Sequence, residues 1–183
     1  RIAWLAARAC AIFAGELVLE PSAGTGMLGI WAAKAGARLA LNEISPLRRE
    51  CLGALFPEAT VTGYDGELID ELLSPNIAPG VVLMNPPYSH GIGRGHDGRT
   101  GARHLRSAWK RLLPGGRLVA VMPEWFDLPR FLAGITGPVA LRLNAAIERG
   151  FIKQGTSITT RLLVLDKVDC GDSRAIAKPV NFA

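Results

Sequence analysis

The sequence predicts an α/β fold, in which short buried strands alternate with helices along the chain. A four-residue apolar strand at residues 17–20 runs into a glycine-containing turn and then into a helix-like run at residues 27–37. Further short apolar runs follow, with room for one helix between successive strands. The composition, with 49% hydrophobic and 20% charged residues in a chain of 183, suits one α/β domain with a single substantial core.

The elements are predicted in order from hydrophobic pattern and from turn residues. An amphipathic helix is expected in the apolar first fifteen residues, which Arg8 interrupts. The first five predicted strands are residues 17–20, 38–42, 59–62, 81–84 and 117–122. The predicted helices are residues 27–37, 46–55, 67–73 and 102–113, followed by a connector with a short helix at 123–132. Pro114-Gly115-Gly116 ends the helix before the fifth strand.

Two more strands are predicted near the end of the chain, at residues 139–146 and 157–166. Both runs are rich in β-branched and aliphatic residues. The segment between them, residues 147–156, is too short for a crossover helix. These two strands are therefore expected to pair antiparallel.

The segment Asn85-Pro86-Pro87-Tyr88 is the most informative stretch, because the buried strand at residues 81–84 stops there. The two prolines fix two φ angles, and Pro86 keeps Asn85 out of helical geometry. The Asn85 amide is thus held at the strand end, with the aromatic face of Tyr88 beside it. The amide oxygen and the Pro86 carbonyl can accept N–H bonds from a flat, nitrogen-bearing group on which the ring stacks. The alternative is an ordinary strand-ending turn.

A second motif, Pro21-Ser22-Ala23-Gly24-Thr25-Gly26, joins the first strand to the following helix. Strand, glycine turn and helix together present backbone N–H groups to a nucleotide-like ligand. The pattern Gly24-x-Gly26-x-x-Gly29 also satisfies the dinucleotide fingerprint, so NAD binding remains an alternative. Glu20, just ahead of the glycines, would repel a pyrophosphate. A carboxylate there suits a ligand with an ammonium and a sulfonium, which favours S-adenosyl-L-methionine.

The stretch from Leu19 to Gly26, paired with Asn85-Pro86-Pro87-Tyr88, resembles the class I S-adenosylmethionine-dependent amino methyltransferases, most of all the N6-adenine DNA methyltransferases. Ribosomal RNA guanine methyltransferases and the glutamine methyltransferases of release factors have closely similar motifs. A weaker likeness is to the methylase part of strawberry-notch-type methylase–helicases. The resemblance covers about residues 17–167. It implies a Rossmann-like fold: a mostly parallel seven-stranded sheet with one antiparallel strand and helices on both faces.

The resemblance also implies roles for individual residues. Glu43, at the end of the second strand, would bind the ribose hydroxyls, Ile44 would lie against the adenine ring, and Asp65 would lie near the adenine amino group. The expected cofactor-binding residues are Glu20, Pro21, Ala23, Gly24, Thr25, Gly26, Glu43, Ile44, Asp65 and Asn85. The expected catalytic residues are Asn85, Pro86, Pro87 and Tyr88. Alternatively, Glu43 precedes Ser45-Pro46 as helix-entry chemistry, and Asp65-Gly66 is a common turn pair.

Basic residues are concentrated between positions 94 and 117, although the net charge is only +5. They are Arg94, Arg99, Arg103, Arg106, Lys110, Arg111 and Arg117, opposed within this run only by Asp97. Residues 89–101 are glycine-rich and polar, which predicts a mobile loop beside the acceptor site. Nucleic-acid phosphates are expected to bind through Arg94, Arg99, Arg103 and Arg106. The alternative is a solvated flexible loop.

No metal site is expected. Cys10, Cys51 and Cys170 lack metal-ligand spacing and are interpreted as free thiols in a reducing cytoplasm. The three histidines, His90, His96 and His104, lack partner cysteines and are interpreted as loop or phosphate-contacting residues. No run has transmembrane length, so no membrane partner and a cytoplasmic location are expected.

The favoured function is methyl transfer to an exocyclic amino nitrogen of a nucleic-acid base, with adenine in DNA as the leading target. Alternatives are an rRNA or a protein-glutamine N-methyltransferase, or a catalytically inactive nucleic-acid-binding module of the same fold. Residues 1–183 are expected to form a single domain with no separate target-recognition domain. Recognition would then come from the basic segment, from a recognition domain or helicase on a longer chain, or from a partner.

Overall fold

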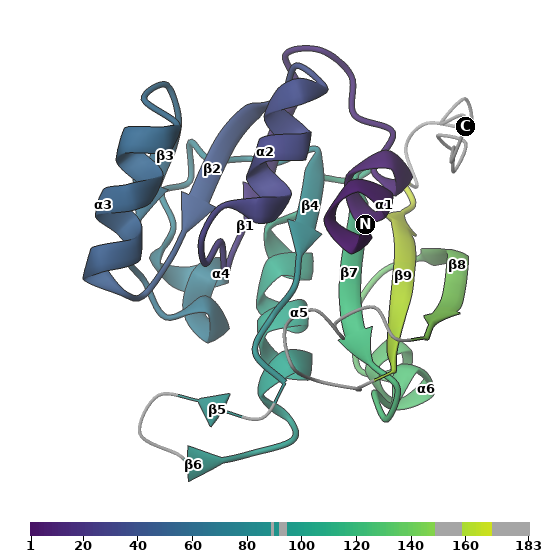
Figure 1. Ribbon diagram of the computed structural model, residues 1–183. Coiled ribbons are helices and arrows are strands. Elements are labelled where there is room, and N and C mark those ends of the chain that lie inside the picture. Colours follow the sequence, from purple (N-terminus) through teal and green to yellow (C-terminus); the bar gives the residue numbers. More distant parts are fainter. Residues whose placement is uncertain (89, 92–94, 149–158, 170–183) are drawn as a thin grey trace.

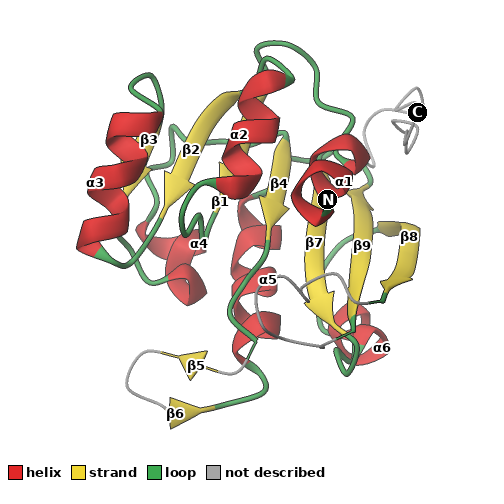
Figure 2. Cartoon of the chain, viewed as in Figure 1, coloured by secondary structure: helices red, strands yellow, loops and turns green. Residues whose placement is uncertain are grey.

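A seven-stranded sheet lies at the centre of the protein (Figures 1 and 2). The structure is a computed structural model that describes residues 1–88, 90–91, 95–148 and 159–169. The strands of the central sheet are β1 (Leu17–Glu20), β2 (Arg38–Asn42), β3 (Thr60–Thr62), β4 (Val81–Met84), β7 (Arg117–Pro123), β8 (Val139–Ile147) and β9 (Thr160–Lys167). Their order across the sheet is β3-β2-β1-β4-β7-β9-β8.

Helices cover both faces of this sheet (Figure 1). The helices are α1 (Ile2–Ala9), α2 (Met27–Lys34), α3 (Pro46–Leu55), the 3₁₀ turn η1 (Gly66–Leu68), α4 (Ile69–Leu72), α5 (Thr100–Arg111) and α6 (Leu128–Ala133). Side chains of α1, α2 and α3 pack on one face, and those of α4, α5 and α6 pack on the other. No helix within the described residues is both long enough and apolar enough to cross a membrane.

The central strands read as continuous apolar runs because both of their faces are buried. In β4, Val81 and Leu83 contact the core beneath α1 and α2, whereas Val82 and Met84 contact the core beneath α5. All four side chains are fully buried. The alternation of side chains along a strand thus divides one run between two cores.

Strands β3, β2, β1, β4 and β7 are parallel, and β9 pairs antiparallel with both β7 and β8. The predicted fold class, a mostly parallel seven-stranded sheet with one reversed strand and helices on both faces, is confirmed. The predicted antiparallel pairing of the last two strands is confirmed as well. Because the parallel strands share one direction, the loops that follow β1, β2, β3 and β4 emerge at the same edge of the sheet.

The segment after β4 differs from the predicted loop. Two short strands, β5 (His90–Gly91) and β6 (Gly95–His96), pair antiparallel there. Two-residue strands of histidine and glycine carry no hydrophobic period, so sequence pattern does not reveal them. Helix α5 begins at Thr100, earlier than predicted, because the Thr100 amide and hydroxyl both donate to the Asp97 carbonyl, at 3.2 and 3.0 Å. Residues 89, 92–94 and 157–158, which were also assigned to predicted elements, lie outside the described residues.

A buried ion pair joins β7 to the reversed strand. Arg117 stands opposite Asp166 in the register, and its Nε and Nη2 donate to the two carboxylate oxygens at 2.6 and 3.0 Å. Arg142, the extra residue of a bulge in β8, donates to Asp166 at 2.8 Å. Burial raises the pKa of Asp166, but the bonds from Arg117 and Arg142 outweigh it and hold that pKa below its usual value. Arg117 is therefore a buried structural residue, although it belongs to the basic run along the sequence.

Replacement of Arg117 by methionine is expected to lower the free energy of unfolding by about 3–5 kcal/mol, because a buried carboxylate loses its main partner. Arg142→Met is the matched control, since the Arg142 side chain is 37% exposed and that of Arg117 is 1% exposed. Urea denaturation of both variants measures the difference. Equal losses for the two variants would contradict the importance assigned to the buried pair.

Candidate active site

Two adjoining cavities lie at the carboxyl edge of the parallel strands. The first, of about 330 Å³, is lined by Pro21, Ser22, Gly24, Asn42, Glu43, Ile44, Arg48, Tyr64, Asp65, Gly66, Asn85, Pro87 and His104. The second, of about 310 Å³, is lined by Arg1, Ile2, Ala3, Glu20, Ser22, Ala23, Gly24, Thr25, Met27, Leu28, Asn85 and Val121. Ser22, Gly24 and Asn85 line both cavities. The structure thus brings the glycine turn and Asn85 together on one crevice.

Most of the predicted cofactor residues face one of these two cavities. Pro21, Gly24, Glu43, Ile44, Asp65 and Asn85 line the first, and Glu20, Ala23, Thr25 and Asn85 line the second. Gly26 lines neither. Its φ of +79° and the position of a would-be Cβ, 2.7 Å from the Phe56 ring, require glycine where the chain turns into α2.

Asn42, the last residue of β2, ties three strand ends together. Its Nδ2 donates to the carbonyls of Pro21 and Tyr64 at 3.0 and 2.9 Å. Its Oδ1 accepts from the Thr62 hydroxyl at 2.9 Å and the Tyr64 amide at 2.8 Å. The side chain is 1% exposed, so these four bonds satisfy a carboxamide that has lost contact with water. The loops after β1, β2 and β3 are held at one level as a result.

Glu43 connects the end of β2 to the glycine turn. One carboxylate oxygen accepts from the Gly24 amide at 2.8 Å, and the other accepts from the Ser45 amide at 2.9 Å. Both interpretations of this residue therefore have a structural basis, since Glu43 binds the amide of Ser45 at the N-cap position of α3 and also faces the cavity. A carboxylate offers about four lone-pair sites, so two hydrogen bonds leave acceptor capacity for a ligand.

Asp65 likewise combines a turn with a place in the first cavity. Its Oδ1 accepts from the Glu67 amide at 2.9 Å and so caps η1, as the turn interpretation expects. Its side chain also lines the first cavity beside Gly66.

Glu20 is buried, with 2% of its surface exposed, at the end of β1. Burial raises its pKa well above the usual value; an N–H bond from Gly29 opposes that shift and the neighbouring charge of Glu43 adds to it. Its Oε2 atom has no hydrogen-bond partner within the described residues. A buried carboxylate oxygen without a partner, at the wall of a cavity, suits a cationic ligand group. The residues present therefore fit the positively charged end of S-adenosylmethionine.

His104 lies on α5 rather than in the loop to which the sequence assigned it. It is buried, and its Nδ1 lies 3.1 Å from the Ser22 hydroxyl across the first cavity. Burial lowers the pKa of the imidazole, which favours the neutral ring. His104 therefore belongs to the wall of the first cavity, and its interpretation as a loop residue was wrong. Among the described residues, no group of three or more His, Cys, Asp or Glu side chains could hold a metal ion.

The motif after β4 places an amide and a phenol in contact. The Tyr88 hydroxyl donates to Asn85 Oδ1 at 2.8 Å, and burial raises the pKa of this phenol, which keeps the donor protonated. Pro86 is buried and Pro87 is exposed. The Tyr88 ring meets the Trp125 ring edge-on, with 6.4 Å between centroids. Asn85 thus presents one amide oxygen of fixed orientation, which Tyr88 already binds.

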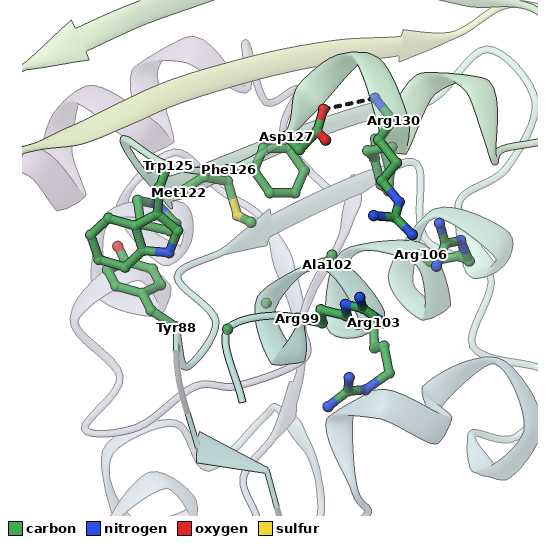
Figure 3. A pocket seen from close by; sticks show the side chains of 14 residues that line it. Tyr88, Arg99, Ala102, Arg103, Arg106, Met122, Trp125, Phe126, Asp127 and Arg130 are labelled. Carbon is green, nitrogen blue, oxygen red and sulfur yellow. Dashed lines mark hydrogen bonds between the residues drawn. The ribbon is translucent and has the colours of Figure 1, made fainter. Parts of the chain in front are cut away.

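A third cavity, of about 410 Å³, begins at Tyr88 (Figure 3). Its walls are Tyr88, Gly98, Arg99, Gly101, Ala102, Arg103, Arg106, Met122, Pro123, Trp125, Phe126, Asp127, Arg130 and Phe131. Three of the predicted nucleic-acid contacts, Arg99, Arg103 and Arg106, are among them. Arg94 lies outside the described residues.

Arg103 and Lys110, two basic residues of the run between positions 94 and 117, are paired with carboxylates from other elements. Arg103 donates to both carboxylate oxygens of Glu67 at 2.7 and 2.8 Å and lies 2.9 Å from Asp97. Lys110 pairs with Asp70 at 2.6 Å. The expectation that only Asp97 opposes the run holds along the sequence but not in space, because the fold brings η1 and α4 against α5.

The comparisons with known proteins agree with this architecture. No family model matches the chain. A curated relative, the ribosomal RNA small subunit methyltransferase C of Chromohalobacter salexigens, is 29% identical over 126 residues, which are 68% of this chain and 36% of that protein. The chain thus spans about a third of the length of that relative.

Two solved structures show the same fold. One is a Listeria monocytogenes protein assigned to the class I S-adenosylmethionine-dependent methyltransferases, with a TM-score of 0.70, 16% identity and coverage of 94% of this chain and 59% of that chain. The other is the M protein of the type I restriction enzyme EcoKI, with a TM-score of 0.74, 15% identity and coverage of 93% and 44%. This chain has the class I S-adenosylmethionine-dependent methyltransferase fold. The cofactor named for the Listeria protein is the one that the sequence predicted.

Several residues of this methyltransferase fold line the cavities although sequence reasoning did not single them out. They are Asn42, Arg48, Tyr64, Trp125 and Arg130. Asn42 carried one available signal, since a polar residue that ends a buried strand just before an acid must find partners at the sheet edge. Arg130 carried none, because it stands outside the basic run.

Glu20→Gln is expected to change how stability depends on pH. Because the pKa of Glu20 is raised in the folded state, the unfolded chain gives up this proton first, and the wild type loses stability as pH rises above the ordinary glutamate pKa. The variant lacks this loss, so its free energy of unfolding should rise relative to wild type between pH 4.5 and pH 8. Urea denaturation across that range measures it. Glu50→Gln, at an exposed position on α3, is the control, and parallel curves for Glu20→Gln and wild type would refute the assignment.

Proposed function

We propose that this chain binds S-adenosylmethionine across the first two cavities and transfers its methyl group to an exocyclic amino nitrogen of a nucleic-acid base. One observation carries the proposal. Asn85 lines both of these cavities and is hydrogen-bonded to Tyr88, which lines the third. A flat group held in the third cavity would therefore meet the amide at the point where the cofactor cavities end.

The chain supplies acidic groups for each polar part of the cofactor. Glu43 would face the ribose hydroxyls and Asp65 the adenine amino group, with Ile44 against the adenine ring. Glu20 would face the ammonium and sulfonium end, where its Oε2, which has no hydrogen-bond partner among the described residues, would gain one. When bound, S-adenosylmethionine would supply a methyl group on a positively charged sulfur.

The acceptor nitrogen is a poor nucleophile, because its lone pair is delocalised into the ring of the base, so the protein must activate it. Asn85 Oδ1 and the Pro86 carbonyl would accept its two N–H bonds, which turns the lone pair out of the plane of the base. Tyr88 occupies one lone pair of Oδ1 and leaves the other for the substrate. Positioning of the two reactants supplies most of the rate, and the oxygen acceptors stabilise the positive charge that develops on nitrogen.

Adenine in DNA is the substrate that we propose first, from the resemblance of the Asn85–Tyr88 motif. Ribosomal RNA is the second candidate, because the curated relative from Chromohalobacter is a ribosomal RNA methyltransferase. Protein glutamine is disfavoured by the arginines of the third cavity, since a substrate without phosphate does not require them. If the acceptor base lies in a duplex, it must leave the stack to reach Asn85. A recognition domain or helicase on a longer chain could supply sequence specificity.

Asn85→Ala is expected to lower the rate of methyl transfer by about a hundredfold or more, because the acceptor loses an oriented hydrogen-bond partner. The dissociation constant for S-adenosylmethionine, measured by calorimetry, should change less than about threefold, since loss of the Asn85 carboxamide leaves the acidic contacts intact. Asn144→Ala, at an exposed position of β8, is the control and should transfer at the wild-type rate. Retention of full activity by Asn85→Ala would exclude the proposed role.

The substrate class can be tested with isotope-labelled S-adenosylmethionine offered with single-stranded DNA, duplex DNA, ribosomal RNA or release factor. Label is expected in nucleic acid, in adenine of DNA first. Label in protein alone would overturn the proposal. Tight cofactor binding without any labelled product would favour the inactive binding module, and a titration without cofactor uptake would exclude every methyltransferase function.

A further inference from the structure

The third cavity has two ends of different chemistry (Figure 3). Tyr88 and Trp125 form an aromatic end beside Asn85, and the Trp125 ring is 57% exposed. The opposite end carries the arginines from α5 and its N-terminal turn, Arg99, Arg103 and Arg106, together with Arg130 from α6. Exposed aromatic rings suit a base, and guanidinium groups suit an anion.

Arg106 and Arg130 are the arginines best placed to bind an anion. Arg103 is already neutralised by Glu67 and Asp97. The guanidinium of Arg106 instead lies over the Phe131 ring, 6.0 Å from its centroid, and a Cβ at Gly134 would lie 3.0 Å from its Nη2. Among the residues that line the cavity, Asp127 is the one carboxylate, and its Oδ1 accepts the backbone N–H of Arg130 at 3.0 Å. Positive charge therefore predominates at this end.

Phe131 on α6 adjoins both of these arginines. It is 2% exposed, belongs to the core cluster that also contains side chains of α5, and is next to Arg130 in sequence. The guanidinium group of Arg106 lies over the face of the same ring. Arg106 and Arg130 thus come from separate helices to the same end of one cavity, where their guanidinium groups can offer several N–H donors to one tetrahedral anion (Figure 3).

We propose that Arg106 and Arg130 bind a phosphate group of the target nucleotide while its base lies against Tyr88 and Trp125. The site then selects a phosphate-bearing nucleotide and rejects a nucleoside or a glutamine side chain. This inference rests on the proposed function for the location of the acceptor base. The inference goes beyond the proposed function because it assigns Arg130, which no sequence motif marks, to substrate recognition.

The test compares adenosine 5′-monophosphate with adenosine as probes, titrated against the fluorescence of Trp125 at fixed ionic strength. The chain has four tryptophans, so Trp125→Phe identifies the part of the signal that comes from this cavity. The monophosphate is expected to bind at least about tenfold more tightly than adenosine, because a charged hydrogen bond to a guanidinium contributes about 1.5–3 kcal/mol. Arg106→Gln and Arg130→Gln should each reduce that preference severalfold and leave adenosine affinity unchanged.

Matched controls are Lys34→Gln and Arg38→Gln, which remove the same charge from exposed positions on α2 and β2. With a nucleic-acid substrate that the wild type methylates, Arg106→Gln and Arg130→Gln should raise KM and leave kcat within about twofold. Arg106→Lys should restore part of the affinity. Equal affinity for the two probes, or equal losses in the controls, would overturn the proposal. If the preference and its dependence on Arg106 and Arg130 are observed but no nucleic acid is methylated, the proposed function fails and the phosphate site stands.

Discussion

The hydrogen bonds of the Asn42 side chain are the interaction on which the rest of the site depends. One buried carboxamide joins the ends of β1, β2 and β3 through Pro21, Thr62 and Tyr64. If it were lost, backbone groups of Pro21 after β1 and of Tyr64 after β3 would lose their partners, at a cost that a surface contact cannot offset. Since the acids at these ends must face two adjoining cavities, the site exists only when these strands end at the same level.

Charge divides the crevice into two parts with a neutral amide between them. Carboxyl groups from the ends of β1, β2 and β3 surround the first two cavities, and arginines from two helices surround the third. In the proposed function, a cationic cofactor would lie in the first two cavities and an anionic substrate in the third, with Asn85 and its partner Tyr88 between them. The arrangement keeps each ligand away from the part of the site that repels it, which favours productive orientation over affinity alone.

The strands at residues 17–20, 38–42 and 81–84 were predicted with the bounds that the structure has. Each is a short apolar run closed by turn residues, so local sequence holds all the information needed. Helix α3 was equally well defined, because Pro46 stands at its first turn. The pairing of β5 with β6 and the early start of α5 could not be predicted, since both depend on hydrogen bonds between residues of the loop rather than on a period in the sequence.

The sequence by itself determined the elements and the two loops that carry the glycine turn and the Asn85–Tyr88 motif, because proline and glycine restrict the backbone locally. Only the tertiary structure decided which charged and polar groups meet. Arg117 pairs with Asp166, 49 residues away, and His104 reaches Ser22, 82 residues away. Arg130 on α6 reaches the same cavity as Arg106 on α5, whose guanidinium lies over the Phe131 ring of α6. Hydrophobic pattern specifies which face of an element is buried, but the partners of its polar groups depend on how the elements pack together.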